Sequence, residues 1–385
     1  MAKFKDICTK IGSGATPKGG KEAYCEDGIS LIRSQNVLDF AFSAGGLACI
    51  NELQAEKLKN VIVEEDDVLL NITGDSVARA CIVDKKYLPA RVNQHVCIIR
   101  ADSSKAIPSY LLYYLQLNKE YLLQLASGGA TRNALTKDMI NNLELELPTI
   151  EEQQKVVAVL DDIQKKIDFN NAINENLEQQ ALALFSNYYE HSTTEVGFTD
   201  LIQVLGGGTP KTGERTYWNG NIPFFTPKDI DCPYTLATEK TITDDGLSHC
   251  NSRLYPVNTV FVTARGTVGK VGIAGVPMAM NQSCYALIGK GIHQLLAYFY
   301  TLKVVDRLKH KASGAVFDAI ITKDFETEQV VKLFPNDADT FIKIAEPMYQ
   351  FILNNSIENQ RLIALRNSLL PKLMSSELDV SGIQL

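Results

Sequence analysis

Two stretches of the chain place hydrophobic residues at alternating intervals of four and three positions, which is typical of coiled-coil helices and not of short surface helices. The first pattern runs through Val156, Leu160, Ile163, Ile167, Asn170, Asn174 and Leu177. The second runs through Met348, Ile352, Asn355, Asn359, Leu362, Arg366 and Leu369. We therefore predict long helices at residues 150–190 and 337–385, the second range including a C-terminal tail.

Two asparagines interrupt each hydrophobic pattern near its middle. An asparagine at such a position lowers stability but fixes the register of a helix pair, because a shift would leave its amide without a partner. Two seams of equal length in one chain favour an antiparallel pair, which we predict. The simpler alternative is that each helix packs only on its own domain.

The starts of both helices carry capping signals. Thr149-Ile150-Glu151-Glu152 is a capping box, in which the Thr hydroxyl and the Glu carboxylate each satisfy a free backbone amide. At the second helix, Asn336 is the expected cap, with Asp337 and Asp339 in the first turn, where the helix dipole favours negative charge. Pro347 is expected to kink the second helix or to mark its true start.

The segments before the helices have a mixed pattern. Apolar runs between Gly- and Asn-containing turns, and one stretch that alternates apolar and acidic residues before a proline, predict strands at Val61–Val63, Asp67–Ile72, Val260–Val262 and Leu143–Leu147. Longer patterns predict helices at Leu111–Leu125 and Leu295–Leu308. The expected fold class is α+β, with mixed α/β domains at residues 1–149 and 191–336, each followed by a long helix.

The two domains repeat one sequence pattern in the same order. The matching pairs are Phe4-Lys5-Asp6-Ile7 with Phe198-Thr199-Asp200-Leu201, Gly12–Lys18 with Gly206–Lys211, residues 28–37 with 220–230, Asn93-Gln94 with Asn281-Gln282, and Thr136-Lys137-Asp138 with Thr322-Lys323-Asp324. A period of about 190 residues is too long for a solenoid unit, so it indicates two copies of a domain. We expect the copies to be related by a pseudo-twofold.

Composition restricts the possible functions. The 385 residues suffice for two or three domains with cores of their own. The formal net charge of −7 argues against a non-specific nucleic-acid coat, whose affinity would come from a basic surface. A sequence reader remains compatible with this charge, because a few basic and amide side chains can enter a groove while partner subunits supply further phosphate contacts.

The cysteines and the apolar runs indicate a reduced cytoplasmic protein. Eight cysteines include no Cys-x-x-Cys pair, so neither a zinc site nor a disulfide framework is indicated. No apolar run approaches the roughly 18 residues of a membrane span. The N-terminus also lacks the apolar core of a signal peptide.

Several near-matches to catalytic motifs fail. Asn221-Ile222-Pro223-Phe224 resembles the loop of amino-methyltransferases, but Ile stands at its second position and no glycine-rich cofactor loop precedes it. Gly12–Lys18 has Pro17 where a phosphate-binding loop needs glycine. Gly74-Asp75-Ser76 lacks the second glycine of a nucleophile elbow, and the five histidines show no metal-ligand spacing. We expect no catalytic residue and no metal in this chain.

The borders of the long helices resemble those of a known family. Leu147–Val156 is similar to the Leu-Pro-x-x-Glu-Glu-Gln start of the helices in specificity subunits of type I restriction–modification systems. Leu369–Leu378 resembles the Leu-Leu-Pro-Lys-Leu-x-Ser-Gly-Glu ending in the same family, with Ser376 in place of the glycine. The Gly-Thr-Pro-Lys loops and the Asn-Gln pairs also match, so the likeness covers essentially the whole chain.

This resemblance implies a DNA-binding subunit without its own catalysis. Each target-recognition domain would read one half of a split double-stranded DNA site, and the helices would set the spacing of the half-sites. The helices would also dock two methyltransferase subunits, which an endonuclease/translocase subunit can join. S-adenosylmethionine would bind to the methyltransferase partners and not to this chain.

Base reading needs Arg or Lys for guanine and Asn or Gln for adenine. In the first domain the candidates are Lys18, Arg33, Gln35, Asn36, Arg79, Asn93, Gln94 and Arg132. In the second they are Lys211, Lys228, Arg265, Lys270, Asn281 and Gln282. A structural turn is the alternative role of both Asn-Gln pairs. Because Arg33 aligns with Thr226 and Thr73 with Arg265, the two half-sites should differ.

Two other functions compete with sequence reading. One is an assembly scaffold that joins methyltransferase partners without reading DNA itself. The other is a free-standing methyltransferase, which the missing cofactor loop disfavours.

Overall fold

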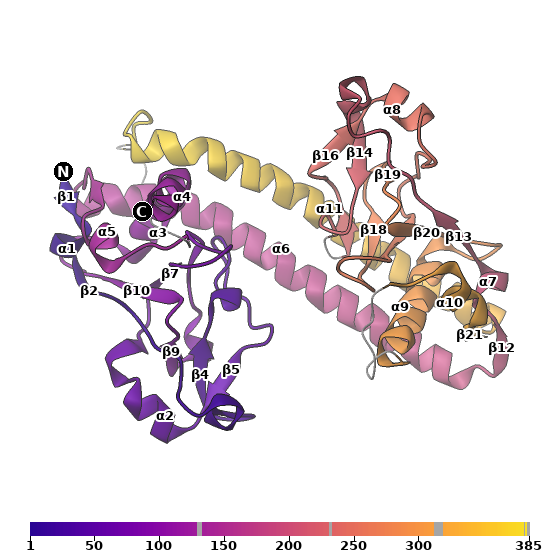
Figure 1. Cartoon of the computed structure of the whole chain (residues 1–385), viewed down its shortest axis with the longest axis horizontal. Coiled ribbons are helices and arrows are strands. Elements are labelled where there is room, and N and C mark those ends of the chain that lie inside the picture. Colours follow the sequence, from indigo (N-terminus) through magenta and orange to yellow (C-terminus); the bar gives the residue numbers. More distant parts are fainter. Residues whose placement is uncertain (129–132, 231–232, 312–318, 381, 383–385) are drawn as a thin grey trace. The chain divides into compact units, whose positions relative to one another are not determined.

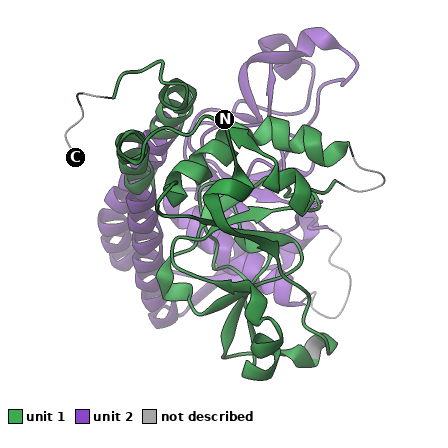
Figure 2. Cartoon of the chain, turned by 90° about the vertical axis from the view of Figure 1, so that its left-hand side faces the viewer, with its two compact units in different colours: residues 1–167, 362–385 green, residues 168–361 purple. Residues whose placement is uncertain are grey.

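The computed structural model describes residues 1–128, 133–230, 233–311, 319–380 and 382. The chain forms two compact units, one of residues 1–167 with 362–385 and one of residues 168–361, here called unit 1 and unit 2 (Figure 2). Two long helices, α6 (Ile150–His191) and α11 (Pro335–Met374), contribute residues to both units (Figure 1). Neither helix therefore belongs only to the domain that precedes it.

The capping box of α6 is confirmed. The Thr149 N–H donates to the Glu152 carboxylate at 2.8 Å, and the Glu152 N–H donates to the Thr149 hydroxyl at 3.3 Å. These reciprocal bonds satisfy amides that the first turn of a helix leaves free. The helix therefore begins where the sequence predicted.

The prediction of Asn336 as the cap of α11 was wrong. The helix begins at Pro335 and Asn336 lies inside it, because the fixed φ of proline suits the first helical position, where its missing N–H costs nothing. The helix does not start at Pro347 either, since it runs unbroken from Pro335 to Met374. Pro347 is exposed, so water can replace the hydrogen bond that proline cannot make.

Unit 1 contains a four-stranded antiparallel sheet in the order β2–β10–β7–β8. Its strands are β2 (Cys8–Ser13), β10 (Val96–Ala101), β7 (Val68–Asn71) and β8 (Ala80–Ile82). A second sheet has the order β3–β5–β4–β9–β6, from β3 (Tyr24–Cys25), β5 (Ala48–Ile50), β4 (Ile29–Ile32), β9 (Ala90–Val92) and β6 (Ile62–Val63). Strand β1 (Ala2–Lys3) pairs with β11 (Glu144–Leu145).

Unit 2 repeats the core of this topology, with five strands in its main sheet and three in its second sheet. Its main sheet has the order β13–β20–β17–β18–β15, from β13 (Ile202–Gly206), β20 (Cys284–Gly289), β17 (Val260–Thr263), β18 (Val271–Ala274) and β15 (Tyr234–Thr235). A second sheet has the order β16–β14–β19, from β16 (Lys240–Ile242), β14 (Trp218–Phe225) and β19 (Ala279–Met280). Strand β12 (Thr194–Gly197) pairs with β21 (Gln329–Lys332).

The pairing directions also repeat. The strands β2–β10–β7–β8 and β13–β20–β17–β18 are antiparallel throughout, whereas β4 pairs with β9, and β14 with β19, in parallel. Terminal pairs β1–β11 and β12–β21 close both domains in the same way. The duplication inferred from the sequence is therefore present in the fold.

The shorter helices follow the same repeat. They are α1 (Phe4–Ile7), α2 (Glu52–Lys57), α3 (Pro108–Leu117), α4 (Lys119–Ser127) and α5 (Lys137–Asn141) in unit 1, and α7 (Phe198–Leu201), α8 (Asp244–Ser248), α9 (Gln294–Lys311) and α10 (Thr322–Thr327) in unit 2. The helix predicted at Leu111–Leu125 is two helices, which are separated at Asn118. The backbone leaves the helical region there, with φ −93° and ψ 20°, and the Asn118 side chain donates to the Tyr114 carbonyl at 2.9 Å.

Three predicted strands are shorter than the sequence indicated, and the range Asp67–Ile72 pairs only over Val68–Asn71. Only Glu144–Leu145 of the range Leu143–Leu147 pairs as a strand, and Val61 belongs to a 3-10 turn that precedes β6. The predictions at Asp67–Ile72, Val260–Val262 and Leu295–Leu308 correspond to β7, β17 and α9.

In unit 1 both long helices pack on the core of the domain. Leu160 and Leu370 are buried in one apolar cluster with the main sheet and helix α3. The Arg366 guanidinium lies 3.6 Å from the centre of the Phe40 ring and also donates to the Gln164 side chain. A cation over an aromatic face is favourable, and it lets a charged residue occupy a buried position of the helix pair.

In unit 2 an aromatic cluster joins the two helices to helix α9. Phe185 of α6 stacks on Phe299 of α9 with ring centres 5.0 Å apart, and Phe341 of α11 meets Phe299 edge-on at 5.0 Å. All three rings are fully buried. Edge-on and offset stacked rings add to the free energy gained from burial alone.

The asparagines of the two hydrophobic patterns face each other in unit 2. The Asn170 amide donates to Asn359, and the Asn355 amide donates to Asn174, each at 2.8 Å. Asn359 in turn donates to Asn171 at 2.8 Å. Residue numbers rise along α6 as they fall along α11, so the helices are antiparallel, as predicted. Because Asn170 bonds to Asn359 and Asn174 bonds to Asn355, Asn170 of the first helix occupies the position that Asn355 occupies in the second.

Every predicted seam residue is buried or half-buried. Val156, Leu160, Ile167, Asn170, Ile352, Asn355 and Asn359 are buried, whereas Ile163, Asn174, Leu177, Met348, Leu362 and Leu369 are half-buried. The asparagines of the seam thus bond to one another at buried or half-buried positions.

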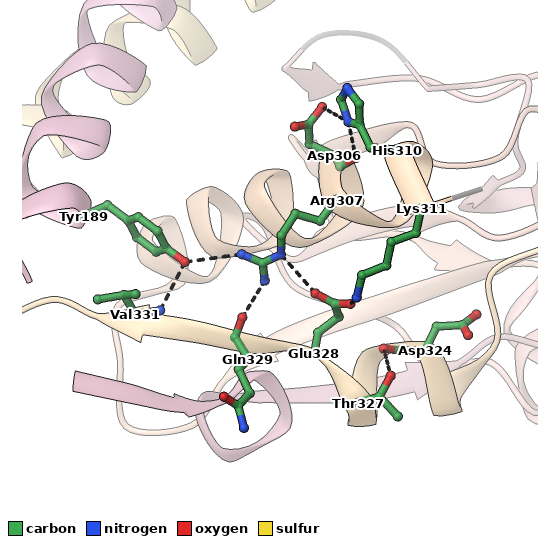
Figure 3. A network of polar contacts seen from close by, with 10 residues as sticks. All are labelled: Tyr189, Asp306, Arg307, His310, Lys311, Asp324, Thr327, Glu328, Gln329 and Val331. Carbon is green, nitrogen blue, oxygen red and sulfur yellow. Dashed lines mark hydrogen bonds and ion pairs between the residues drawn. The ribbon is translucent and has the colours of Figure 1, made fainter. Parts of the chain in front are cut away.

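A charged network joins α6, α9 and β21 in unit 2 (Figure 3). Glu328 is only 3% exposed and accepts from Arg307 at 3.0 Å and from Lys311. Burial raises the pKa of the Glu328 carboxyl, but the hydrogen bonds and charges of Lys311 and Arg307 outweigh it and lower that pKa below its ordinary value. Tyr189 of α6 accepts from the Val331 N–H at 3.1 Å and from Arg307.

We predict that Asn170→Leu destabilises unit 2 by about 1–3 kcal/mol, because the Asn359 amide loses a partner inside a buried interface. The double variant Asn170→Leu/Asn359→Leu should recover most of this loss. It removes both amides at once, so that neither of the two positions holds a buried polar group without a partner. Urea unfolding followed by circular dichroism measures both, with exposed Asn354→Leu as the control. Equal losses in the single and double variants would contradict this role.

We predict that the stability of unit 2 falls as the pH drops below about 4.3, the ordinary pKa of glutamate. Because folding lowers the pKa of Glu328, its carboxylate stabilises the fold above that pH and the contribution is lost on protonation. Glu328→Gln should be less stable at neutral pH but should lose less stability on acidification. Thermal unfolding against pH tests this, and Glu326→Gln, an exposed neighbour, should keep the wild-type profile.

Candidate nucleic-acid interface

Each unit carries an Asn-Gln turn before the central strand of its main sheet. In unit 1 the turn lies between β9 and β10, and in unit 2 between β19 and β20. The Asn93 side chain accepts from the His95 N–H, and the Asn281 side chain accepts from the Ser283 N–H, both at 3.0 Å. With these bonds each asparagine stabilises its own turn, which is the structural role that the sequence pattern indicates as the alternative to base reading.

The glutamine beside each asparagine points to the surface. Gln94 and Gln282 are both exposed. The hydroxyl of Thr16 donates to the amide oxygen of Gln94, and the hydroxyl of Thr209 donates to that of Gln282. Both threonines belong to the repeated Thr-Pro-Lys loops, so the fold joins two motifs that are far apart in the sequence.

Glycine allows these loops to approach the turns. The Gly14 N–H donates to the Asn93 carbonyl at 3.1 Å, and a Cβ at Gly14 would lie 1.6 Å from the Val92 carbonyl oxygen. In unit 2, a Cβ at Gly207 would lie 2.1 Å from the Asn281 carbonyl oxygen. A Cβ atom does not fit at either distance. Only glycine, which has no side chain, allows the loop to contact the turn at these two positions.

An open pocket lies next to the turn in unit 1. It has a volume of about 1080 Å³ and is lined by polar side chains from several loops: Ser34, Gln35, Thr73, Asp75, Ser76, Arg79, His95, Ser127 and Asn133. Thr73 and His95 meet across it, with Oγ1 and Nδ1 2.5 Å apart.

Unit 2 has a smaller pocket of about 430 Å³ at the corresponding place. Its lining includes Thr226, Lys228, Lys240, Arg265, Asn281 and Ser283. Both pockets take in the loop after the third strand of the main sheet, with Gly74 at φ 77° and Gly266 at φ 80°. Thr73 bridges to Ala134, and Arg265 to Ala319, which shows that the two loops occupy equivalent places.

The two pockets differ in chemistry. In unit 1, Thr73 and His95 are hydrogen-bonded to each other. In unit 2, Arg265 is exposed and, within the part of the chain that the structure describes, makes no side-chain hydrogen bond or ion pair. Lys228 and Lys240 are beside it. A free guanidinium in an open polar pocket is suited to a base edge or a phosphate.

The structure does not support Asn36 and Asn93 as base-contacting residues. Asn36 is fully buried, and its amide donates to the carbonyls of Ser43 and Gly45. Asn93 is 8% exposed and holds its own turn. In both cases the short amide side chain is buried and bonds to nearby backbone.

The other candidates in unit 1 fall into two groups. Gln35 and Arg79 line the pocket, and Gln35 also donates to the Gly46 carbonyl at 3.1 Å. Arg33 is half-buried and donates to the same carbonyl at 2.6 Å, so it stabilises the loop. Lys18 is exposed beside the Thr16 loop. Arg132 lies outside the described residues.

In unit 2, Lys228, Arg265 and Asn281 line the pocket, and Gln282 lies next to it along the chain. Lys211 is exposed on the Thr209 loop. Lys270 is exposed but does not line the pocket. The structure thus brings most of the candidate DNA-binding residues of the second domain together, whereas Lys270 lies outside the pocket.

Sequence reasoning missed several pocket residues, including His95, Ser34 and Lys240. Thr16 and Thr209 were also missed as partners of the glutamines. Their signal was present, because each lies at the same place in a repeated motif. The contact between that motif and the Asn-Gln turn appears only in the fold.

Metal and membrane sites have no support in the described parts of the chain. No group of His, Cys, Asp or Glu side chains there could hold a metal ion. None of the helices there has both the length and the apolar character of a membrane span.

Comparison with known sequences identifies the family. The model of the type I restriction modification DNA specificity domain matches the chain twice, at residues 1–179 and 193–367. The chain belongs to this family. Its two DNA specificity domains correspond to the two copies found in the sequence and in the strand topology.

Individual relatives agree with this assignment. The chain is 21% identical over 434 residues to the HindI specificity subunit of Haemophilus influenzae, and the match covers 91% of this chain and 94% of the relative. It is 29% identical over 169 residues to the MjaIX specificity subunit of Methanocaldococcus jannaschii, or 42% of this chain and 39% of the relative. The fold is similar to that of a type I restriction–modification S subunit from M. genitalium, with a TM-score of 0.56, 14% identity and coverage of 97% and 95%.

Proposed function

We propose that this chain is the specificity subunit of a type I restriction–modification system and that each unit reads one half of a bipartite DNA site. One observation carries the proposal: both DNA specificity domains hold a polar pocket at the same topological place, lined by different side chains. Two different DNA half-sites can be read by one repeated fold if the side chains that line its pocket differ between the two copies. The chain contributes recognition, and catalysis belongs to its partners.

The proposed partners are double-stranded DNA, two methyltransferase subunits and an endonuclease/translocase subunit that can join them. S-adenosylmethionine would bind to the methyltransferase subunits, in the cytoplasm. The long helices offer a docking surface in unit 2, where Phe169 is 66% and Phe351 51% exposed. Large exposed aromatic side chains on a helix indicate protein contacts. Further phosphate contacts from these partners would offset the net charge of −7.

The scaffold alternative needs only the helices. It gives no reason for exposed glutamines held in place in both units, or for pockets that differ in their hydrogen-bonding groups. Sequence reading accounts for both features.

The function is tested by binding of duplex DNA to the chain assembled with its methyltransferase subunits. We expect strong preference for one bipartite sequence and an affinity that falls steeply with salt concentration. Selection from a randomised duplex library gives the sequence, and mapping methylated adenines gives an independent readout. Binding without sequence preference would support the scaffold alternative.

Arg265 is predicted to read a guanine in the half-site of unit 2. Arg265→Ala should reduce discrimination at one base position by about 1–3 kcal/mol, because a bidentate contact to guanine is lost. The half-site of unit 1 should not change. Lys270→Ala, exposed but outside the pocket, is the matched control and should at most weaken binding to all sequences alike. Unchanged base preference in Arg265→Ala would exclude this role.

The helix pair is predicted to set the spacing of the half-sites. Inserting seven residues in α6 and seven in α11, next to the asparagine pairs, keeps the seam in phase and lengthens each helix by about 10 Å. The preferred spacer should then grow by roughly three base pairs. Library selection with variable spacers measures the change, and the same insertion in α6 alone should abolish specific binding. An unchanged spacer in the double insertion would contradict the prediction.

A further inference from the structure

Gln94 and Gln282 are held by the same contact in both units. In each case a threonine far away in the sequence, 78 residues from Gln94 and 73 from Gln282, donates its hydroxyl to the amide oxygen. Both glutamines are nevertheless exposed. A surface glutamine normally has free rotation, so repeated fixation of this side chain indicates that its orientation matters.

In unit 1 the nitrogen end of the amide is held as well. Gln94 Nε2 lies 3.0 Å from His95 Nε2. Because an amide nitrogen can only donate, His95 Nε2 must accept, and the ring proton lies on Nδ1. There it faces Thr73 Oγ1 at 2.5 Å. One chain of donation thus runs from Thr16 through Gln94 and His95 to Thr73.

The Gln94 amide keeps one unused position at each end. Its oxygen has a second lone pair, and its nitrogen has a second N–H. Adenine presents an N–H donor at N6 and an acceptor at N7 in the major groove, which matches one acceptor and one donor side by side. Guanine offers two acceptors there, cytosine one donor and thymine one acceptor, so none of them satisfies both ends.

We propose that Gln94 reads an adenine in the half-site of unit 1 and Gln282 an adenine in that of unit 2, with Thr16 and Thr209 as positioning residues. This inference rests on the proposed function and specifies its chemistry. In unit 2, Ser283 stands in the place of His95, so no ring holds the nitrogen end of Gln282. Unit 1 therefore discriminates more strictly than unit 2.

The test uses the chain assembled with its methyltransferase subunits and library selection of bound duplexes. Gln94→Glu keeps the shape of the side chain but replaces the amide nitrogen by a second acceptor, which faces adenine N7 unfavourably. It should lower the preference for adenine at one position of the unit 1 half-site by on the order of ten-fold or more. Gln282→Glu, the matched control, should affect only the other half-site.

Thr16→Val and Thr16→Ser separate positioning from structural support. Thr16→Val removes the hydroxyl and should reduce the adenine preference at the Gln94 position, whereas Thr16→Ser should restore it. His95→Ser should bring the discrimination of unit 1 down to that of unit 2. Thermal unfolding of each variant identifies those that lose the fold.

The possible outcomes are distinct. If the wild-type assembly selects no bipartite sequence, the proposed function fails. If it selects one that lacks adenine in the unit 1 half-site, or if Gln94→Glu leaves every position unchanged, the inference alone is overturned. A uniform loss of affinity for all sequences in Gln94→Glu or Thr16→Val would also overturn it, because it would reveal structural support without base reading.

Discussion

Paired asparagine amides between α6 and α11 determine which residues of the two helices face each other. Asn170 with Asn359 and Asn174 with Asn355 can bond in one register only, since a shift would leave buried amides unpaired. The rest of unit 2 depends on this register, because Phe341 reaches Phe185 and Phe299 only when α11 is in place. The asparagines therefore bury less apolar surface than leucines would, but they specify a single register of α6 and α11.

The two DNA specificity domains show how one scaffold supports two recognition surfaces. The strands that the two units share have the same order and pairing direction, and the loop–turn contact is also the same. Among the described residues, strand β15 extends the main sheet only in unit 2, and β3 and β6 extend the second sheet only in unit 1. The residues that differ, such as Thr73 and Arg265, stand on loops at the edge of the pockets. Loops tolerate substitution because few core contacts depend on them, so the lining can vary while the sheet stays constant.

Much of the fold followed from the sequence. The capping box at Thr149, the antiparallel helix pair and the duplication are local or periodic signals, which a single chain displays directly. The starts of elements were less predictable. Asn336 has the composition of a cap, but Pro335 before it fits the first helical position better.

Which candidate residues line the pockets was only partly predictable from the sequence. Asn36 and Gln35 are neighbours with similar chemistry, yet Asn36 is buried in its own loop and Gln35 lines the pocket. Which amide turns inward depends on turn geometry that composition does not specify. Thr16 and Gln94 were both within recognised motifs, but their contact joins distant segments and arises from the tertiary fold.

The long sequence separation between Thr16 and Gln94 has a consequence for biosynthesis. Closing such a loop costs conformational entropy that only the folded domain repays, so the oriented amide cannot exist before the sheet has formed. Base reading by Gln94, as proposed above, therefore requires the folded domain.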